Sequence, residues 1–439
     1  MITQIRIDGF KSFVGFELDA HPVTVLLGVN GAGKSNLFDA LRLVSGTLHH
    51  GFDATVAGDR RLAVRDLFHR GGDDRAPLRD SFRITVGAVV PSADGPLPVR
   101  LRVEAGLVLP TASRAGAPHR AALVRGQSRI WVSRLENTDW MDRLGYPDGL
   151  RADIVRARDA FTARTGTWAA TIGGPILGDP TAADDDELFG THREAAGTLE
   201  LLGLAARETA AWQPYVLEPG ALRRLGRPEA DGPLEPHGGN LAVVLDRISA
   251  TDPESRTRLV ADLAALVPGV RDLRTEVVRT RGEYDFEVEF QHTGWVSPAS
   301  LSDGTLRALA LLAAFWDRDR AGVLAVEEIE NGMHLSQVAD LVRRLGRGAG
   351  LPAPADRTTP GQLLVTTHSP ALLAALRTDL SGGVVFLDQA NHVDPERGTV
   401  SRITTARPLR PRDPEAEPGG STTPQAVDRL LRGLERGAA

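Results

Sequence analysis

The sequence has no cysteine, no long hydrophobic run and almost no lysine. Without cysteine, the 439 residues can form no disulfide, no thiolate nucleophile and no cysteine zinc site. The longest apolar stretch, residues 306–316, is too short to span a bilayer, and residues 1–7 lack the pattern of a secretory signal. We therefore expect a cytoplasmic protein that uses no membrane.

Only two of the 51 basic residues are lysines, and one of them, Lys34, lies in a glycine-rich loop. Residues 28–35 read G-V-N-G-A-G-K-S and follow the apolar segment 23–27. In such a loop backbone N–H groups surround phosphates, the lysine reaches the β and γ oxygens, and the serine hydroxyl binds Mg²⁺. The alternative is a glycine-rich turn before an ordinary helix. The expected ATP-binding residues are Asn30, Gly31, Ala32, Gly33, Lys34, Ser35 and Asn36, with Ser35 also a metal ligand.

Two adjacent acids end a second apolar segment. Residues 323–328 read V-L-A-V-E-E, which predicts a buried strand followed by two carboxylates. We expect Glu327 to bind Mg²⁺ and Glu328 to polarise the attacking water, as a catalytic residue beside Lys34. The alternative is that the two acids only begin a loop.

Two further segments combine a polar turn with a predicted helix. Ser302 and Gly304 lie in L-S-D-G-T-L-R, directly before an apolar helix, where they form either an N-cap or an anion site. His368 ends the strand-like segment 364–367 and is followed by Ser-Pro, a good helix start.

In this order the four segments resemble the Walker A, signature, Walker B and switch-histidine motifs of ABC-type ATPases. Residues 5–13 (I-R-I-D-G-F-K-S-F) and 327–334 (E-E-I-E-N-G-M-H) are similar to motifs of the RecF/SMC/OLD-like group. The resemblance implies ATP hydrolysis with His368 as a catalytic γ-phosphate sensor. It also implies that Ser302 and Gly304 contact ATP bound to a second copy. A Q-loop glutamine is not assigned, because residues 50–90 contain none.

The expected fold is an α/β head with a mixed sheet flanked by helices, an antiparallel β subdomain and an inserted, mainly helical lobe. Expected units are residues 1–135 and 271–407 for the two ATPase lobes, 136–270 for the helical lobe, and 408–439 for a linker and helix. We expect the first helix to end at Gly46. Residues 50–80 should form an irregular connector with a short helix near 62–69. Antiparallel strands are expected over 82–90, 97–107 and 121–135, and a helical pattern over 153–267.

The resemblance implies an ATP-driven switch that forms a homodimer and acts in DNA repair or anti-phage defence. DNA and a separate effector or nuclease chain are possible partners, although the formal net charge of −6 gives no overall attraction for nucleic acid. Arginines between residues 60 and 79 alternate with aspartates, which favours a salt-bridged surface over a DNA site. An ATP-dependent scaffold or a regulatory subunit of a nuclease or toxin is the alternative function.

Overall fold

The computed structural model describes residues 1–71, 78–108, 123–132, 149–167, 169–172, 195–278, 282–317, 322–349, 361–376, 383–394 and 398–409. A mixed sheet of five strands, ordered β11-β12-β3-β13-β14, lies at its centre. The first four strands are parallel and β14 is antiparallel to β13. The short strands β3 and β11 are buried along their whole length, as their continuous apolar sequences predict. The strands are β3 (Val23–Leu27), β11 (Val323–Val326), β12 (Gln362–Thr367), β13 (Val384–Asp394) and β14 (Thr399–Pro408).

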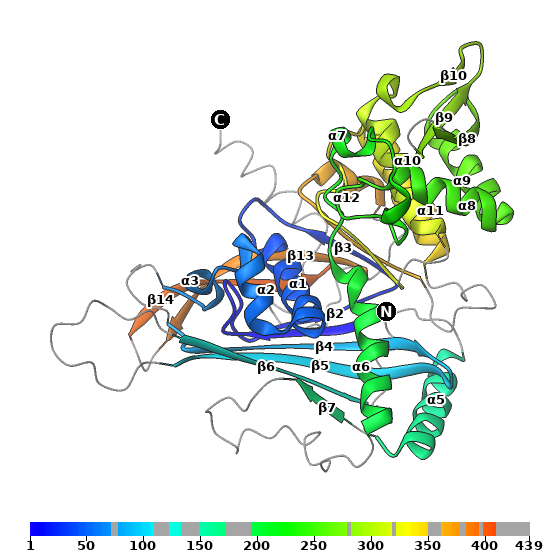
Figure 1. Ribbon diagram of the computed structural model, residues 1–439. Helices are drawn as coiled ribbons and strands as arrows, with labels where there is room; N and C mark the ends of the chain where they lie inside the picture. The colour runs from blue at the N-terminus through cyan, green and yellow to red at the C-terminus, as the bar shows by residue number, and fades with distance from the viewer. Residues whose placement is uncertain are drawn as a thin grey trace, which may run out of the picture.

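An antiparallel sheet of six strands, ordered β2-β1-β4-β5-β6-β7, forms a second layer. Figure 1 shows helices α1 and α2 between this sheet and the mixed sheet. Apolar side chains of both sheets and of α1 form one buried cluster that joins these layers. The elements are β1 (Ile2–Asp8), β2 (Phe16–Asp19), β4 (Ser81–Ser92), β5 (Gly95–Val108), β6 (Leu123–Val132), β7 (Ala169–Ile172), α1 (Lys34–His50), α2 (Phe52–Gly58) and α3 (Val64–Leu67).

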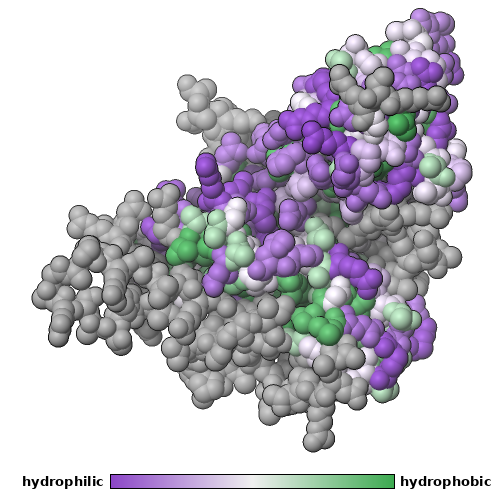
Figure 2. All heavy atoms as spheres, viewed as in Figure 1, coloured by the Kyte–Doolittle hydropathy of each residue, from purple (hydrophilic) through white to green (hydrophobic). Residues whose placement is uncertain are grey.

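A second buried cluster lies in the upper right part of Figure 1, around α10. A three-stranded sheet, ordered β10-β9-β8, belongs to this part. Figure 2 shows mostly polar side chains over it, so its apolar residues face inward on this side. The elements are α7 (Pro219–Leu222), α8 (Leu241–Thr251), α9 (Pro253–Leu266), β8 (Val270–Val278), β9 (Glu283–Phe290), β10 (Gly294–Val296), α10 (Asp303–Trp316), α11 (Leu335–Gly348) and α12 (Pro370–Leu376).

The segment expected as a helical lobe, residues 136–270, contributes to both clusters. Helices α5 (Leu150–Thr165) and α6 (Ala195–Thr209) supply apolar side chains to the cluster of the antiparallel sheet, whereas α8 and α9 belong to the cluster around α10. Because β7 lies within this segment, the expectation of a helical pattern over 153–267 is wrong at 169–172. The four domain boundaries stay a prediction, and residues 410–439 lie outside the described part.

Two local expectations are wrong. Helix α1 does not end at Gly46 but continues to His50, and Gly46 is buried inside it. A Cβ on Gly46 would lie 2.4 Å from Cγ2 of Thr55, so this glycine permits α2 to pack closely against α1. Residues 50–80, expected as an irregular connector, contain α2 as well as the short helix α3. None of the described helices is both long and apolar enough to cross a membrane.

Candidate nucleotide site

Three neighbouring parallel strands place the predicted site residues at one edge of the mixed sheet. Strands β11, β12 and β3 are adjacent, with Val326 opposite Val365 and Thr367 opposite Leu27. Their carboxyl ends therefore lie together, and that edge is where ligands bind in open α/β sheets. The phosphate loop, Glu327 and His368 directly follow these three strands.

The phosphate loop is a tight turn held by the β13–β14 hairpin. Gly31 and Gly33 have φ values of 82° and 98°, which favour glycine. A Cβ on Gly33 would lie 2.2 Å from Thr404 Oγ1, so a side chain there has no room. Thr404 Oγ1 donates to the carbonyl of Ala32 (3.0 Å), and Gln389 Nε2 donates to the carbonyl of Gly31 (2.6 Å). Asn30 lies at the exposed tip of the loop.

Lys34 is the first residue of α1, and its ammonium lies under the loop. Its Nζ donates to the carbonyls of Gly28 (2.5 Å) and Val29 (2.9 Å). Burial lowers the pKa of Lys34 because it disfavours the charged form. Three carboxylates oppose this shift by favouring the ammonium: Glu328, Glu330 and Glu327.

Ser35 and Glu327 meet directly. The Ser35 hydroxyl donates to Oε1 of Glu327, so the two expected metal ligands are adjacent. Hydroxyl and carboxylate oxygens suit Mg²⁺, which is commonly held by one or two carboxylates together with substrate phosphates. No group of three or more His, Asp or Glu among the described residues is placed to hold a metal ion. The hydroxyl of Ser35 and the carboxylate of Glu327 fit an Mg²⁺ that is shared with nucleotide phosphates.

Glu328 is held in an uncommon backbone conformation. Its φ of 51° lies in the left-handed region, which costs free energy for a residue with a side chain. Its backbone N–H donates to Thr366 Oγ1 (2.9 Å), and Asn331 Nδ2 donates to its carboxylate oxygen Oε2 (2.8 Å). The neighbouring strand β12 and Asn331 thus fix both the backbone and the carboxylate of Glu328.

His368 contacts a third acid of the same loop. Its Nδ1 lies 2.9 Å from Oε1 of Glu330, and its backbone N–H donates to the same oxygen (2.8 Å). The hydroxyl of Thr367 also donates to this oxygen (2.9 Å). The loop after β11 and the end of β12 therefore form one hydrogen-bonded unit.

Ser302 and Gly304 lie at the start of α10, in a different part of the molecule from α1 (Figure 1). Ser302 is the N-cap of α10, since its Oγ accepts a hydrogen bond from the backbone N–H of Thr305 (3.2 Å). A Cβ on Gly304 would lie 2.9 Å from the carbonyl oxygen of Gly332. The N-cap interpretation is confirmed, and the anion-binding role stays a prediction.

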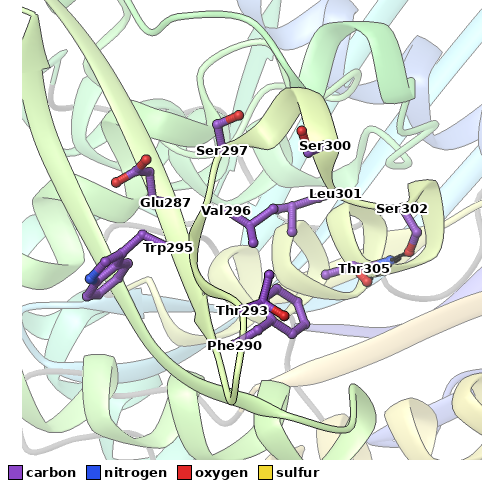
Figure 3. A pocket seen from close by; sticks show the side chains of 10 residues that line it. All are labelled: Glu287, Phe290, Thr293, Trp295, Val296, Ser297, Ser300, Leu301, Ser302 and Thr305. Atoms are coloured by element: carbon purple, nitrogen blue, oxygen red, sulfur yellow. Dashed lines mark hydrogen bonds between the residues drawn. The ribbon is translucent and has the colours of Figure 1, made fainter.

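A pocket of about 730 Å³ lies beside this N-cap, between it and the β9–β10 hairpin. In Figure 3 the side chains of Val296 and Leu301 lie between Trp295 and Ser302. The guanidinium of Arg274 stacks over the Trp295 ring at 4.3 Å from its centroid. This pocket makes the surroundings of Ser302 partly apolar.

Several site contacts were not assigned from the sequence. Glu330 and Asn331 lie in the segment 327–334, whose resemblance to a family motif was the only sequence signal for them. That resemblance did not indicate what either side chain contacts. Gln389 and Thr404 had no signal, because they reach the loop from the far end of the chain. Of the arginines considered for DNA, Arg61 pairs with the buried Asp39 (2.9 Å), which is not one of the interleaved aspartates, so the salt-bridged surface stays a prediction.

Comparison with known proteins gives a consistent family. Residues 23–87 and 219–374 match the family model described as "AAA domain, putative AbiEii toxin, Type IV TA system". The chain is 32% identical over 177 residues to the DNA replication and repair protein RecF of Kineococcus radiotolerans, covering 38% of this chain and 43% of that protein. It is 32% identical over 96 residues to the chromosome partition protein Smc of Bordetella petrii, covering 21% of this chain and 7% of that protein. The chain thus matches less than half the length of either relative.

The fold is also similar to a solved structure, that of an Smc head bound to the C-winged helix domain of ScpA. The TM-score is 0.50 at 14% identity, over 92% of this chain and 97% of that chain. The expected ABC/SMC-type head fold and its relation to RecF and SMC proteins are therefore confirmed.

Proposed function

The chain belongs to the family of AAA domains described as "putative AbiEii toxin, Type IV TA system", and on that premise we propose that it is an ATP-hydrolysing molecular switch. The observation that carries the proposal is the hydrogen bond between Ser35 and Glu327. It joins the phosphate loop to the acidic end of β11, which supports a role for these two residues as ligands of one Mg²⁺.

In this proposal each residue has a defined task. Lys34 would bind the β and γ phosphates, Ser35 and Glu327 would hold Mg²⁺, and Glu328 would accept a proton from the attacking water. Mg²⁺ would supply positive charge at the phosphates. His368 senses the γ-phosphate from the end of β12.

The proposal includes a homodimer in which ATP lies between two copies. Ser302 and Gly304 are at the N-terminus of α10, which favours anions, but α10 lies in a different part of the molecule from α1, the helix that begins at Lys34 (Figure 1). Contact with ATP on a second copy accounts for both facts. ATP binding would then close two heads, and hydrolysis would reopen them.

We further propose that the switch acts in a DNA-related process, either DNA repair or anti-phage defence, with DNA or an effector chain as partner. Support comes from the sequence similarity to a DNA replication and repair protein and to a chromosome partition protein. A nuclease, if one takes part, would be another chain.

The alternative function is an ATP-dependent scaffold, or a regulatory subunit of a nuclease or toxin, with little turnover. One observation favours it: Asn331 occupies an oxygen of the Glu328 carboxylate, which a water-activating base needs. Steady-state phosphate release separates the two functions. The switch predicts turnover that Glu328→Gln reduces at least about 100-fold. Turnover unchanged by Glu328→Gln would contradict the switch.

A further inference from the structure

The carboxylate of Glu330 is placed as a partner of His368 rather than as a ligand of the nucleotide. Its side chain is only 9% exposed, and a single oxygen, Oε1, accepts from the Thr367 hydroxyl and the His368 backbone N–H and lies 2.9 Å from Nδ1 of the His368 ring. The other oxygen, Oε2, is buried without a hydrogen-bond partner among the described residues.

The contact determines which nitrogen of His368 is available to a ligand. A carboxylate can only accept, so Nδ1 must carry a proton when it lies 2.9 Å from Oε1 of Glu330. Nε2 is then the nitrogen left for a ligand, on a side chain that is 45% exposed. With Nδ1 protonated, Nε2 can donate to a phosphate oxygen only when the ring carries both protons.

We propose that Glu330 is a positioning residue that holds His368 with Nδ1 protonated and Nε2 presented to the γ-phosphate. This inference rests on the proposed function, because it assumes that His368 senses ATP. It goes beyond that function by giving the loop after β11 two separate acids: Glu328 for the water and Glu330 for the histidine.

A double-mutant cycle tests the coupling. Glu330→Gln keeps an oxygen that can accept from Thr367 and from the backbone but removes the charge, so kcat should fall about 10-fold or more while the Kd for ATP stays unchanged. His368→Asn should give a similar loss. If Glu330 acts through His368, the double variant should lose no more than about twofold beyond His368→Asn alone.

The matched control is Glu104→Gln, which removes the charge of an acid that pairs with Arg83 (2.6 Å) in the antiparallel sheet. Its kcat should stay at the wild-type value. Multiplied losses in the Glu330/His368 double variant, or an unchanged kcat in Glu330→Gln, would overturn the proposal. Wild-type turnover that does not depend on Glu328 would instead overturn the proposed function.

A second measurement needs no ATP hydrolysis. In ¹⁵N NMR spectra of the imidazole nitrogens, the His368 signals are assigned by their absence in His368→Asn. The expected result is a protonated Nδ1 in the wild type and a mixture of tautomers in Glu330→Ala. A wild-type ring protonated only at Nε2 would contradict the proposal even if the enzyme were inactive.

Discussion

Ser35 and Glu327 are 292 residues apart in the chain, yet the Ser35 hydroxyl donates a hydrogen bond to the Glu327 carboxylate. This contact exists because β3 and β11 flank β12 in the parallel part of the mixed sheet, so their carboxyl ends share an edge. The Glu327 side chain thus reaches the serine directly from the end of its strand.

Asn331→Ala should reduce kcat while leaving ATP binding unchanged. The Asn331 amide donates to Oε2 of Glu328 and orients this carboxylate, and a loss of orientation worth about 1.4 kcal/mol in the transition state would lower the rate roughly tenfold. Phosphate release measures kcat, and a fluorescent ATP analogue measures Kd. Asn391→Ala, an exposed site on β13, is the matched control. A rate increase in Asn331→Ala would show that the amide inhibits Glu328, which favours the scaffold alternative.

Gly33→Ala should disable the phosphate loop and destabilise the protein. Its φ of 98° and the 2.2 Å approach to Thr404 Oγ1 both oppose a side chain, so the free energy of unfolding should fall by about 1–3 kcal/mol. Urea unfolding measures the loss, and titration with ATP should detect no binding. Gly58→Ala is the control, because a Cβ there meets nothing within 4 Å. Equal effects of both variants would contradict the account of the loop.

His69 should make the protein sensitive to mild acid. Burial lowers the pKa of His69 from 6.5, Nδ1 lies 2.7 Å from the Lys11 carbonyl, and Nε2 is buried without a hydrogen-bond partner among the described residues. Because the folded-state pKa lies below the unfolded value, the unfolded chain binds the proton first as the pH falls. Stability contributed by neutral His69 is therefore present above pH 6.5 and is lost below it.

The measurement is urea unfolding at pH 7.5, 6.5 and 5.5. His69→Gln should show a shallower loss of stability with falling pH than the wild type, whereas His50→Gln, at an exposed histidine, should keep the wild-type slope. Parallel curves for the wild type and His69→Gln would show that His69 does not control this transition.

The sequence predicted those parts of the site that are continuous in the chain. The phosphate loop follows β3 and begins α1, and the two acids follow β11, because in each case a strand signal and a polar motif are adjacent. The bracing contacts could not be predicted. Gln389 and Thr404 lie 358 and 372 residues from their loop partners, and only the folded sheet brings them together.

Local rules failed where tertiary packing decided the outcome. Glycine is a helix-stop signal, but Gly46 lies inside α1 because Thr55 of α2 packs against it at a distance that excludes a Cβ. Strand β7 was not predicted because it has only four residues and lies within a segment of mostly helical pattern. It forms a strand because it pairs with β6.

A shared ATP site predicts that two inactive variants restore each other. Lys34→Ala cannot bind the phosphates, and Ser302→Arg places a large side chain at the α10 N-cap, so each alone should be inactive. In a 1:1 mixture a heterodimer has one intact site of its two, so activity should return, to no more than about half of the wild-type value. A mixture that stays inactive, while Ser302→Arg still binds ATP, would argue against a site shared between copies.

The central claim is that this ATP site closes only between two copies, and the most direct test is the mass of Glu328→Gln in solution. Light scattering should give the monomer mass without nucleotide and twice that mass with ATP and Mg²⁺, because bound ATP is not hydrolysed. The same variant carrying Lys34→Ala should remain a monomer under both conditions. A mass of Glu328→Gln that is the same with and without ATP would contradict the account.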